Sequence, residues 1–125
     1  MKLVDTSVLV DHLRGHGVAT ALLEGLVESG ERVVTSELSR FELLAGARPH
    51  EHGELEQVFA ALDWVPVNEA IARGAGEYAR TYRRSHSGIG AVDYLLAATA
   101  TLLGAELLTT NVRHFPMFDA LTPPY

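Results

Sequence analysis

The sequence predicts an α/β fold in which helices cover both faces of a parallel β-sheet. Short β-type runs alternate with helical patterns along the chain, which is typical of such folds. The connections between the runs are too long for hairpins, and this favours parallel strands. The length of 125 residues is typical of one domain, so we expect a single domain over residues 1–125. The expected strands are residues 2–4, 32–35, 64–67 and 106–109.

The segments between these strands carry apolar residues at helical spacing. Residues 18–27, 55–62 and 71–82 place apolar side chains three or four positions apart. Ser36 can begin a helix that ends at Gly46, because its hydroxyl can accept a free backbone N–H. The stretch Ala91–Leu103 is apolar on nearly every side, which predicts a buried helix.

Composition limits the classes of protein to consider. Hydrophobic residues make up 47% of the chain and there is no cysteine, so disulfides and thiolate sites are excluded. No apolar run reaches the roughly 20 residues of a membrane span, and we expect a soluble, cytoplasmic protein with no membrane partner. The net charge of −6 argues against indiscriminate nucleic-acid binding, although Arg80, Arg83 and Arg84 form a local basic group.

Polar residues follow the first and last expected strands. Asp5 comes directly after residues 2–4, and Thr109, Thr110 and Asn111 lie at the end of the last strand. In open parallel sheets, ligands bind beyond the carboxyl ends of the strands. A carboxylate at the end of a buried strand is costly unless another group holds it. We therefore expect a polar site at this edge.

Two further acids lie on inward faces of expected helices. At 100° per residue, Glu42 lies about 40° from Leu38, on the apolar stripe of its helix. Asp93 shares a face with Leu96 and Ala97. Solvated acids usually avoid such positions. The apolar stripe of the Glu42 helix consists of Leu38, Phe41 and Ala45.

Each acid alone has a simpler explanation. Asp5 could cap the helix that follows it. Glu42 could pair with Arg40 or Arg48. Asp93 could stabilise its helix N-terminus by about 0.3–1 kcal/mol. Only a shared cation accounts for all three acids together, and carboxylates favour Mg²⁺ or Mn²⁺.

Other motifs are weaker. The segments "GIGAVD" and "GHGVAT" lack the third glycine of a dinucleotide site, and the chain has no GxxxxGK[ST] motif. Tyr78, Tyr82, Phe59 and Trp64 fit a core better than base-stacking platforms. His114 is harder to assign to the surface, because it closely follows Asn111.

Four segments, in order, resemble the motifs of PIN domains, especially VapC-type toxins of bacterial toxin–antitoxin pairs. They are "LVDTSVLVDHLRG", "SRFELLAG", "GIGAVDYLLAATATLLGAELLTTN" and "VRHFPMF", and they span essentially the whole chain. The resemblance implies a PIN-like α/β sandwich that uses an acid cluster with Mg²⁺ or Mn²⁺ to cleave single-stranded RNA. It makes the chain an endoribonuclease toxin that hydrolyses RNA with a metal-activated water.

The resemblance also assigns residues. It implies that the three core acids, which bind metal and catalyse, are Asp5, Glu42 and Asp93. The supporting residues are Thr6 or Ser7, through a hydroxyl, and Thr110 from the last strand. Many family members have a fourth acid where this chain has Asn111. An Asn can ligate through its carbonyl or position a water, but it lowers the negative charge, so we expect a second metal to be held more weakly.

Substrate and partners follow from the same resemblance. Surfaces bearing arginine would guide the RNA backbone, although each arginine alone could be a solvated side chain: Arg80, Arg83, Arg84 and Arg113. Family membership implies a homodimer and a cognate VapB-type antitoxin, with promoter DNA bound only through that antitoxin. The acidity of this chain predicts a basic, Arg-bearing antitoxin segment.

Two other functions stay open at the level of sequence. One is a catalytically weak or inactive PIN-like module that binds an antitoxin or another partner, which Asn111 favours. The other is a hydrolase of small phosphate esters. An aspartyl-phosphate enzyme usually has a second acid two residues after the first, and this chain has Ser7 there.

Overall fold

The computed structural model describes residues 1–125 and contains a four-stranded sheet. The strands are β1 (Lys2–Val4), β2 (Val33–Ser36), β3 (Asp63–Val65) and β4 (Glu106–Leu108). Their order is β3-β2-β1-β4, and every neighbouring pair is parallel. The predicted α/β fold with a parallel sheet is therefore confirmed.

Three strand boundaries differ from the prediction. β2 lies one residue later than expected, because Ser36 still pairs with Val65 of β3. β3 is shorter than predicted and ends at Val65. β4 ends at Leu108, since Thr109 turns its side chain to Asp5 instead of continuing the strand.

Six α-helices and two short 3₁₀ helices connect and follow the strands. The α-helices are α1 (Thr6–Leu13), α2 (Gly17–Glu28), α3 (Glu37–Gly46), α4 (His52–Ala61), α5 (Glu69–Tyr82) and α6 (Ala91–Leu103). The 3₁₀ helices are η1 (Pro49–Glu51) and η2 (Val112–His114). None of the helices combines the length and the apolar character that crossing a membrane requires. The predicted Ser36 cap is confirmed, because its hydroxyl accepts the N–H of Leu38 at 3.1 Å.

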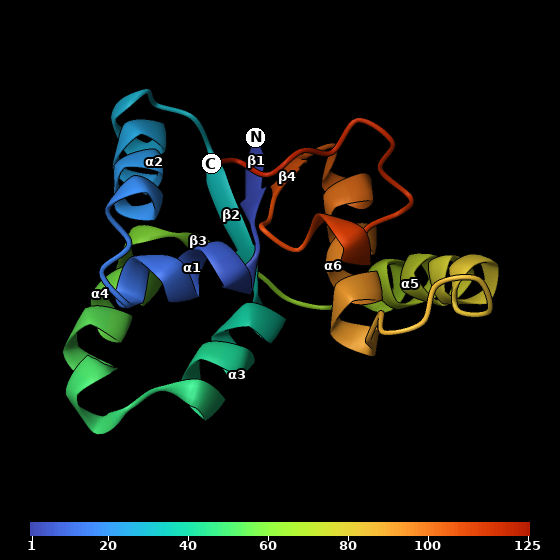
Figure 1. Ribbon diagram of the computed structural model, residues 1–125, viewed down its shortest axis with the longest axis horizontal. Helices are drawn as coiled ribbons and strands as arrows, with labels where there is room; N and C mark the ends of the chain where they lie inside the picture. The colour runs from blue at the N-terminus through green and yellow to red at the C-terminus, as the bar shows by residue number, and fades with distance from the viewer.

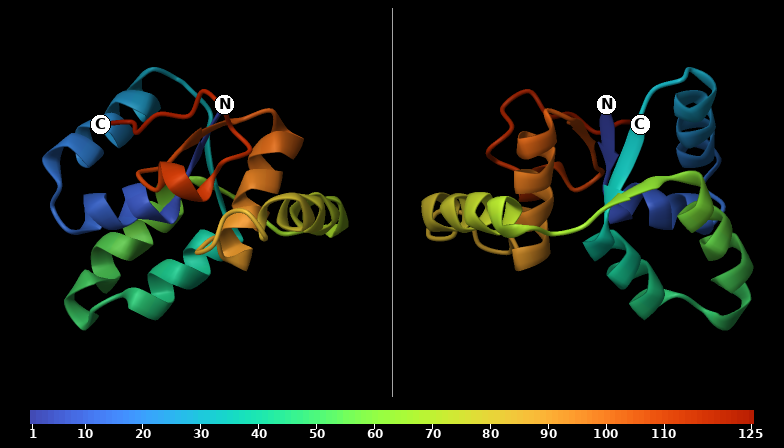
Figure 2. Two further views of the ribbon diagram at one scale, coloured as in Figure 1. Left: turned by 45° about the vertical axis from the view of Figure 1, so that its right-hand side comes forward. Right: turned by 180° about the vertical axis from the view of Figure 1, so that it is seen from behind.

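Helices cover both faces of the sheet, as predicted. Figure 1 shows α1 to α4 on one side and α5 with α6 on the other, and the two views of Figure 2 agree. Successive strand residues point to opposite faces. Val4 and Leu108 pack in the core on the α1 side, whereas Leu3 and Leu107 pack with α6. Both faces are therefore apolar, as in other buried parallel sheets.

The carboxyl ends of the strands gather the starts of three helices. α1 follows β1, α3 follows β2, and α6 runs back along the sheet from the same edge (Figure 1). The two chain termini lie at the opposite edge of the sheet. Asp5, the residue between β1 and α1, therefore lies where helix starts from distant parts of the chain converge.

Candidate active site

Asp5 is held by hydroxyl groups. Its side chain is buried, and Oδ2 accepts the Thr109 hydroxyl at 2.6 Å and the Ser7 hydroxyl at 3.0 Å. The backbone N–H of Thr110 donates to Ser7 Oγ at 3.1 Å, and that of Asn111 donates to Thr109 Oγ1 at 3.0 Å. No protein donor reaches Asp5 Oδ1. The chain thus fixes one carboxylate oxygen and leaves the other open.

Asp5 does not cap α1 through its side chain. It occupies the N-cap position, but its carboxylate accepts no N–H from the helix. The backbone carbonyl of Asp5 instead accepts the N–H of Val8 at 3.2 Å. The explanation of Asp5 as a side-chain cap is therefore wrong, because the carboxylate is directed to β4.

Asp93 approaches the same edge from the first turn of α6. Its side chain is 20% exposed, and Oδ2 accepts the N–H of Gly90 at 3.2 Å. His114 Nδ1 lies 3.1 Å from the same oxygen. Asp93 thus stabilises its helix start, as the simpler explanation predicted. Its Oδ1, like that of Asp5, receives no hydrogen bond from the protein.

Asp5 and Asp93 repel each other. Burial raises the pKa of Asp93, and the nearby charge of Asp5 raises it further. The Gly90 N–H and His114 act in the opposite direction on this pKa. A buried carboxylate whose charged form is disfavoured by a second carboxylate, with an open oxygen on each, is an arrangement that a cation would stabilise.

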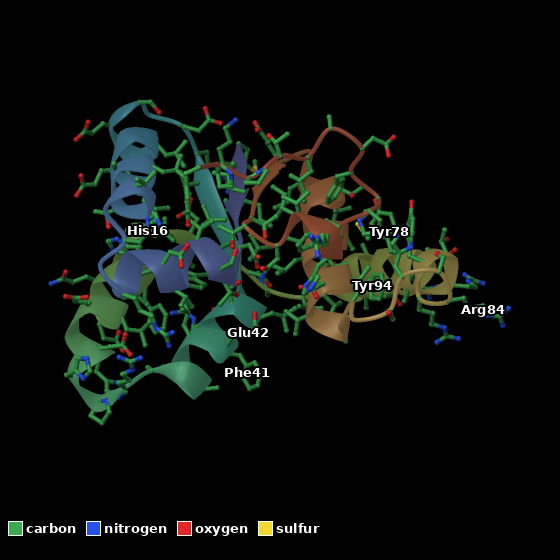
Figure 3. All side chains as sticks on the ribbon, in the orientation of Figure 1. His16, Phe41, Glu42, Tyr78, Arg84 and Tyr94 are labelled. Carbon is green, nitrogen blue, oxygen red and sulfur yellow. The ribbon has the colours of Figure 1, made fainter.

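Glu42 lies at the same edge but has a separate contact. The Thr6 hydroxyl donates to Glu42 Oε1 at 2.7 Å and lies 2.9 Å from Ser39 Oγ. Thr6 begins α1 directly after Asp5, so its hydrogen bond to Glu42 connects the positions of the two acids. Figure 3 shows Glu42 on α3, beside the start of α1. Thr6 is thus a supporting residue for Glu42, whereas Ser7 supports Asp5.

The buried face of α3 differs from the predicted stripe. Ser39 and Leu43 are buried, whereas Phe41 is 64% exposed and Ala45 is also exposed. The predicted stripe contained only apolar residues, whereas the buried residue on this face that contacts Thr6 is Ser39. Glu42 lies next to Leu43 and is half-buried, so the acid still faces inward, although for another reason than the one predicted.

Neither arginine suggested as a partner for Glu42 pairs with it. Arg40 Nε lies 2.5 Å from Glu37 Oε1, one turn earlier on α3. The Arg48 backbone N–H donates to Glu51 at 2.8 Å, and its guanidinium lies 4.0 Å from the same carboxylate. The ion-pair explanation of Glu42 is therefore wrong, and its carboxylate keeps only the Thr6 hydroxyl.

Asp5 and Asp93 lie near enough for their charges to interact, and Glu42 is held by Thr6, the residue after Asp5. No group of three His, Asp or Glu side chains is arranged to hold one ion directly. Mg²⁺ usually keeps several waters and is bound through one or two carboxylates. The two open oxygens of Asp5 and Asp93 fit that requirement, and their mutual repulsion favours it. Direct ligation by Glu42 stays a prediction.

Asn111 and the arginines are placed as follows. Asn111 is exposed, and its side chain caps nothing in η2. Figure 3 shows Arg84 at the far end of α5, well away from Glu42, and Arg80 pairs with Glu77 on that helix. Arg14, which was not among the predicted site residues, lines a cleft of about 60 Å³ together with Glu42.

Thr109 and His114 are the contacts that the sequence analysis did not assign. Thr110, the predicted support, contributes its backbone N–H, whereas Thr109 contributes the side chain that reaches Asp5. Alternation places Leu107 and Thr109 on the same side, but only the register of β4 with β1 shows that this side faces Asp5. His114 follows Asn111 closely and lies in the segment "VRHFPMF" that resembles PIN domains, but neither signal assigned it a contact.

This geometry agrees with the comparisons to known proteins. The PIN domain family matches residues 2–120. The chain belongs to the PIN-domain family. It is 58% identical to Ribonuclease VapC19 of Mycobacterium tuberculosis over 125 residues, all of both chains. It is 45% identical to Ribonuclease VapC10 of the same organism, over all of this chain and 93% of that one. The predicted membership among VapC-type ribonucleases is confirmed.

Solved structures share the fold. A toxin–antitoxin complex from Klebsiella pneumoniae matches with a TM-score of 0.83 and 23% identity, covering 100% of this chain and 98% of the other. VapBC2 from Rickettsia felis, bound to a promoter DNA fragment, matches with a TM-score of 0.82 and 20% identity, covering 98% and 96%. At these identities the likeness concerns the arrangement of sheet and helices.

Proposed function

We propose that this chain is the ribonuclease toxin of a toxin–antitoxin pair and hydrolyses RNA with the help of Mg²⁺ or Mn²⁺. The observation that carries the proposal is the pairing of Asp5 and Asp93 at the carboxyl edge of the sheet, each with one oxygen fixed and one open. The names of the full-length relatives support RNA as the substrate. An RNA substrate in turn supports a cytoplasmic location.

The residues have distinct roles in this proposal. A bound divalent ion would stabilise charge on the attacked phosphate and lower the pKa of a water. Asp5 and Asp93 would hold that ion through their open oxygens. Glu42, kept in place by Thr6, would orient the attacking water through its remaining oxygen. Asn111, whose backbone N–H donates to Thr109, would position a water beside the acids through its side chain.

The proposed chemistry determines the ends of the product. Water attacks phosphorus, the bond from phosphorus to the 3′-oxygen breaks, and that oxygen takes up a proton. The products carry a 3′-hydroxyl and a 5′-phosphate. No 2′-hydroxyl takes part as nucleophile, so a 2′,3′-cyclic phosphate does not form. This separates the reaction from that of metal-independent ribonucleases, which are common contaminants.

The test is cleavage of a structured RNA pool with Mg²⁺, followed by analysis of the product ends. We expect 5′-phosphate ends, loss of cleavage in EDTA, and loss of cleavage in Asp5→Asn. Glu56→Gln is the matched control, since it removes an exposed carboxylate on α4. Cyclic phosphate ends, or equal cleavage by Asp5→Asn and wild type, would contradict the proposal.

We also propose two protein partners. A cognate VapB-type antitoxin is supported by the toxin–antitoxin complexes among the structural neighbours, some of them bound to DNA, and promoter DNA would be reached only through it. A homodimer is supported by Phe41 and Leu44, which are 64% and 48% exposed on one face of α3. Light scattering of wild type and Phe41→Glu tests the dimer, and we expect the variant to be monomeric.

The alternative is a weak or inactive module that binds its partner without chemistry. Two points favour it: position 111, where the resemblance to PIN domains implies an acid, is Asn, and no three acidic or histidine side chains surround one point. This alternative predicts antitoxin binding without RNA cleavage at any concentration of Mg²⁺ or Mn²⁺. The same cleavage assay therefore separates the two functions.

A further inference from the structure

We propose that His114 is a positioning residue for Asp93 and does for that carboxylate what Thr109 and Ser7 do for Asp5. This inference rests on the proposed function, because it concerns the acid pair that would bind the divalent ion. The observation is the contact of 3.1 Å between His114 Nδ1 and Asp93 Oδ2.

The direction of this hydrogen bond follows from the chemistry of the groups. An ionised carboxylate only accepts hydrogen bonds, so the imidazole proton lies on Nδ1 and is donated to Asp93. The other ring nitrogen, Nε2, is then directed away from the carboxylate, and the side chain is 41% exposed. Because His114 and Gly90 both contact Oδ2, Asp93 Oδ1 is the oxygen left for a ligand.

The backbone of His114 is anchored on both sides. The N–H of His114 donates to the carbonyl of Asn111 at 2.9 Å within η2. Phe115, the next residue, is 1% exposed in the core beneath α6. A buried anchor on one side and a closed turn on the other fix the backbone position from which the imidazole reaches Asp93. The contact with Asp93 is thus built into the fold.

The two carboxylates therefore have equivalent supports from the same segment of chain. Thr109 reaches Asp5 and His114 reaches Asp93, and both follow β4. Partners that orient a metal-binding group typically change metal affinity or activity by about 10–100-fold when removed. Asn111, where the resemblance to PIN domains implies an acid, lies between these two supports. In this chain, the segment after β4 acts by orienting two acids instead of adding one.

The test uses a pair of variants that separate the two ring nitrogens. In His114→Asn, the amide nitrogen can take the place of Nδ1, whereas in His114→Gln it can take the place of Nε2. Mn²⁺ affinity is measured by calorimetry on both variants and on His114→Ala. His86→Asn is the matched control, because His86 lies in an exposed turn after α5.

We expect His114→Asn and His86→Asn to bind Mn²⁺ within about threefold of wild type. His114→Gln and His114→Ala should bind about 10–100-fold more weakly. Equal affinity in all four variants would overturn the proposal, as would equal losses in the Asn and Gln variants. If His114→Ala fails to fold, the Asn and Gln variants alone decide the question.

A second measurement does not depend on metal. Nitrogen-15 NMR of the metal-free protein reports which ring nitrogen of His114 carries the proton. We expect Nδ1–H in wild type and loss of this preference in Asp93→Ala. A proton on Nε2 in wild type would overturn the proposal. If wild type cleaves RNA but the His114 variants match it, only this inference fails. If wild type neither binds Mn²⁺ nor cleaves RNA, the proposed function fails as well.

Discussion

The two sides of the candidate site are supported in different ways. Asp5 and Asp93 are fixed by groups from the residue after β4, from η2 and from the loop before α6, so distant parts of the chain must be in place before these carboxylates are oriented. Glu42 depends on the single hydroxyl of Thr6 and lies on a helix with an exposed outer face. The fold therefore specifies the Asp5–Asp93 pair more tightly than it specifies Glu42, and substitutions should show this difference.

The largest effect should come from Asp5→Asn. The amide keeps the shape of the carboxylate, but its neutral oxygen is a poor ligand for a hard cation. We expect RNA cleavage to fall roughly 10³-fold, which corresponds to about 4 kcal/mol of activation free energy. Initial rates at saturating Mg²⁺ measure the change, and circular dichroism shows that the variant is folded. A loss of less than tenfold would contradict the central role of Asp5.

Asp93→Asn should reduce cleavage by a similar or somewhat smaller factor than Asp5→Asn, roughly 10²-fold or more. The same substitution should make the metal-free protein more stable than metal-free wild type. The folded pKa of Asp93 lies above its ordinary value of 3.8. The metal-free wild type therefore loses stability as the pH rises from below 3.8 through that raised pKa. Asn carries no charge and avoids this loss.

Thermal unfolding in EDTA measures the effect of Asp93→Asn on stability. We expect the Tm of the variant to exceed that of wild type by roughly 2–4 °C at pH 7 and by less at pH 4. Added Mg²⁺ should raise the Tm of wild type only. A variant that is less stable than wild type at both pH values would show that the capping role of Asp93 outweighs its repulsion from Asp5.

Glu42 tests the more loosely supported side of the site. We expect Glu42→Gln to lower cleavage roughly 10–100-fold through the loss of charge near the attacking water. Thr6→Val removes only the hydroxyl and should lower cleavage about 3–10-fold, as expected for one net hydrogen bond of about 0.5–1.5 kcal/mol. Steady-state rates on one RNA compare the two variants. If Thr6→Val matched Asp5→Asn, the two sides of the site would be equally constrained.

The smallest effect should come from Asn111→Asp. The substitution places an acid at an exposed position. An exposed opposite charge typically contributes about 0.2–1 kcal/mol, so we expect Mn²⁺ affinity to rise about 2–5-fold. Calorimetry measures both the affinity and the number of ions bound. A loss of affinity would mean that the amide of Asn111 has a role that a carboxylate cannot fill.

The sequence predicted the parts of the fold that depend on periodicity. The helix Ala91–Leu103 and the Ser36 cap have the predicted positions, because a long apolar segment and a hydroxyl before a helix are local signals. The edge of the sheet that holds Asp5 and the end of β4 also followed from the parallel topology, whereas Asp93 was predicted from its inward position on a helix. These predictions needed only spacing and strand direction.

The contacts within the site were not predictable in the same way. The inward face of α3 is set by Ser39 and Leu43, and no hydrophobic pattern marks a buried serine. The choice of Thr109 over Thr110 depends on which side of β4 each residue faces, and this follows only once the register with β1 is known. His114 reaches Asp93 through a 3₁₀ turn, and a turn this short has no periodic pattern in the sequence.

The central claim is that Asp5 and Asp93 bind one divalent ion at the carboxyl edge of the sheet. Mn²⁺ broadens the NMR signals of nearby nuclei, so a titration into nitrogen-15-labelled protein locates the ion. We predict that broadening begins at residues 5–7, 93 and 109–111, reaches Glu42 later, and disappears from all of them in Asp93→Asn. Broadening that begins among the exposed acids of α4, or that persists unchanged in Asp93→Asn, would contradict the account.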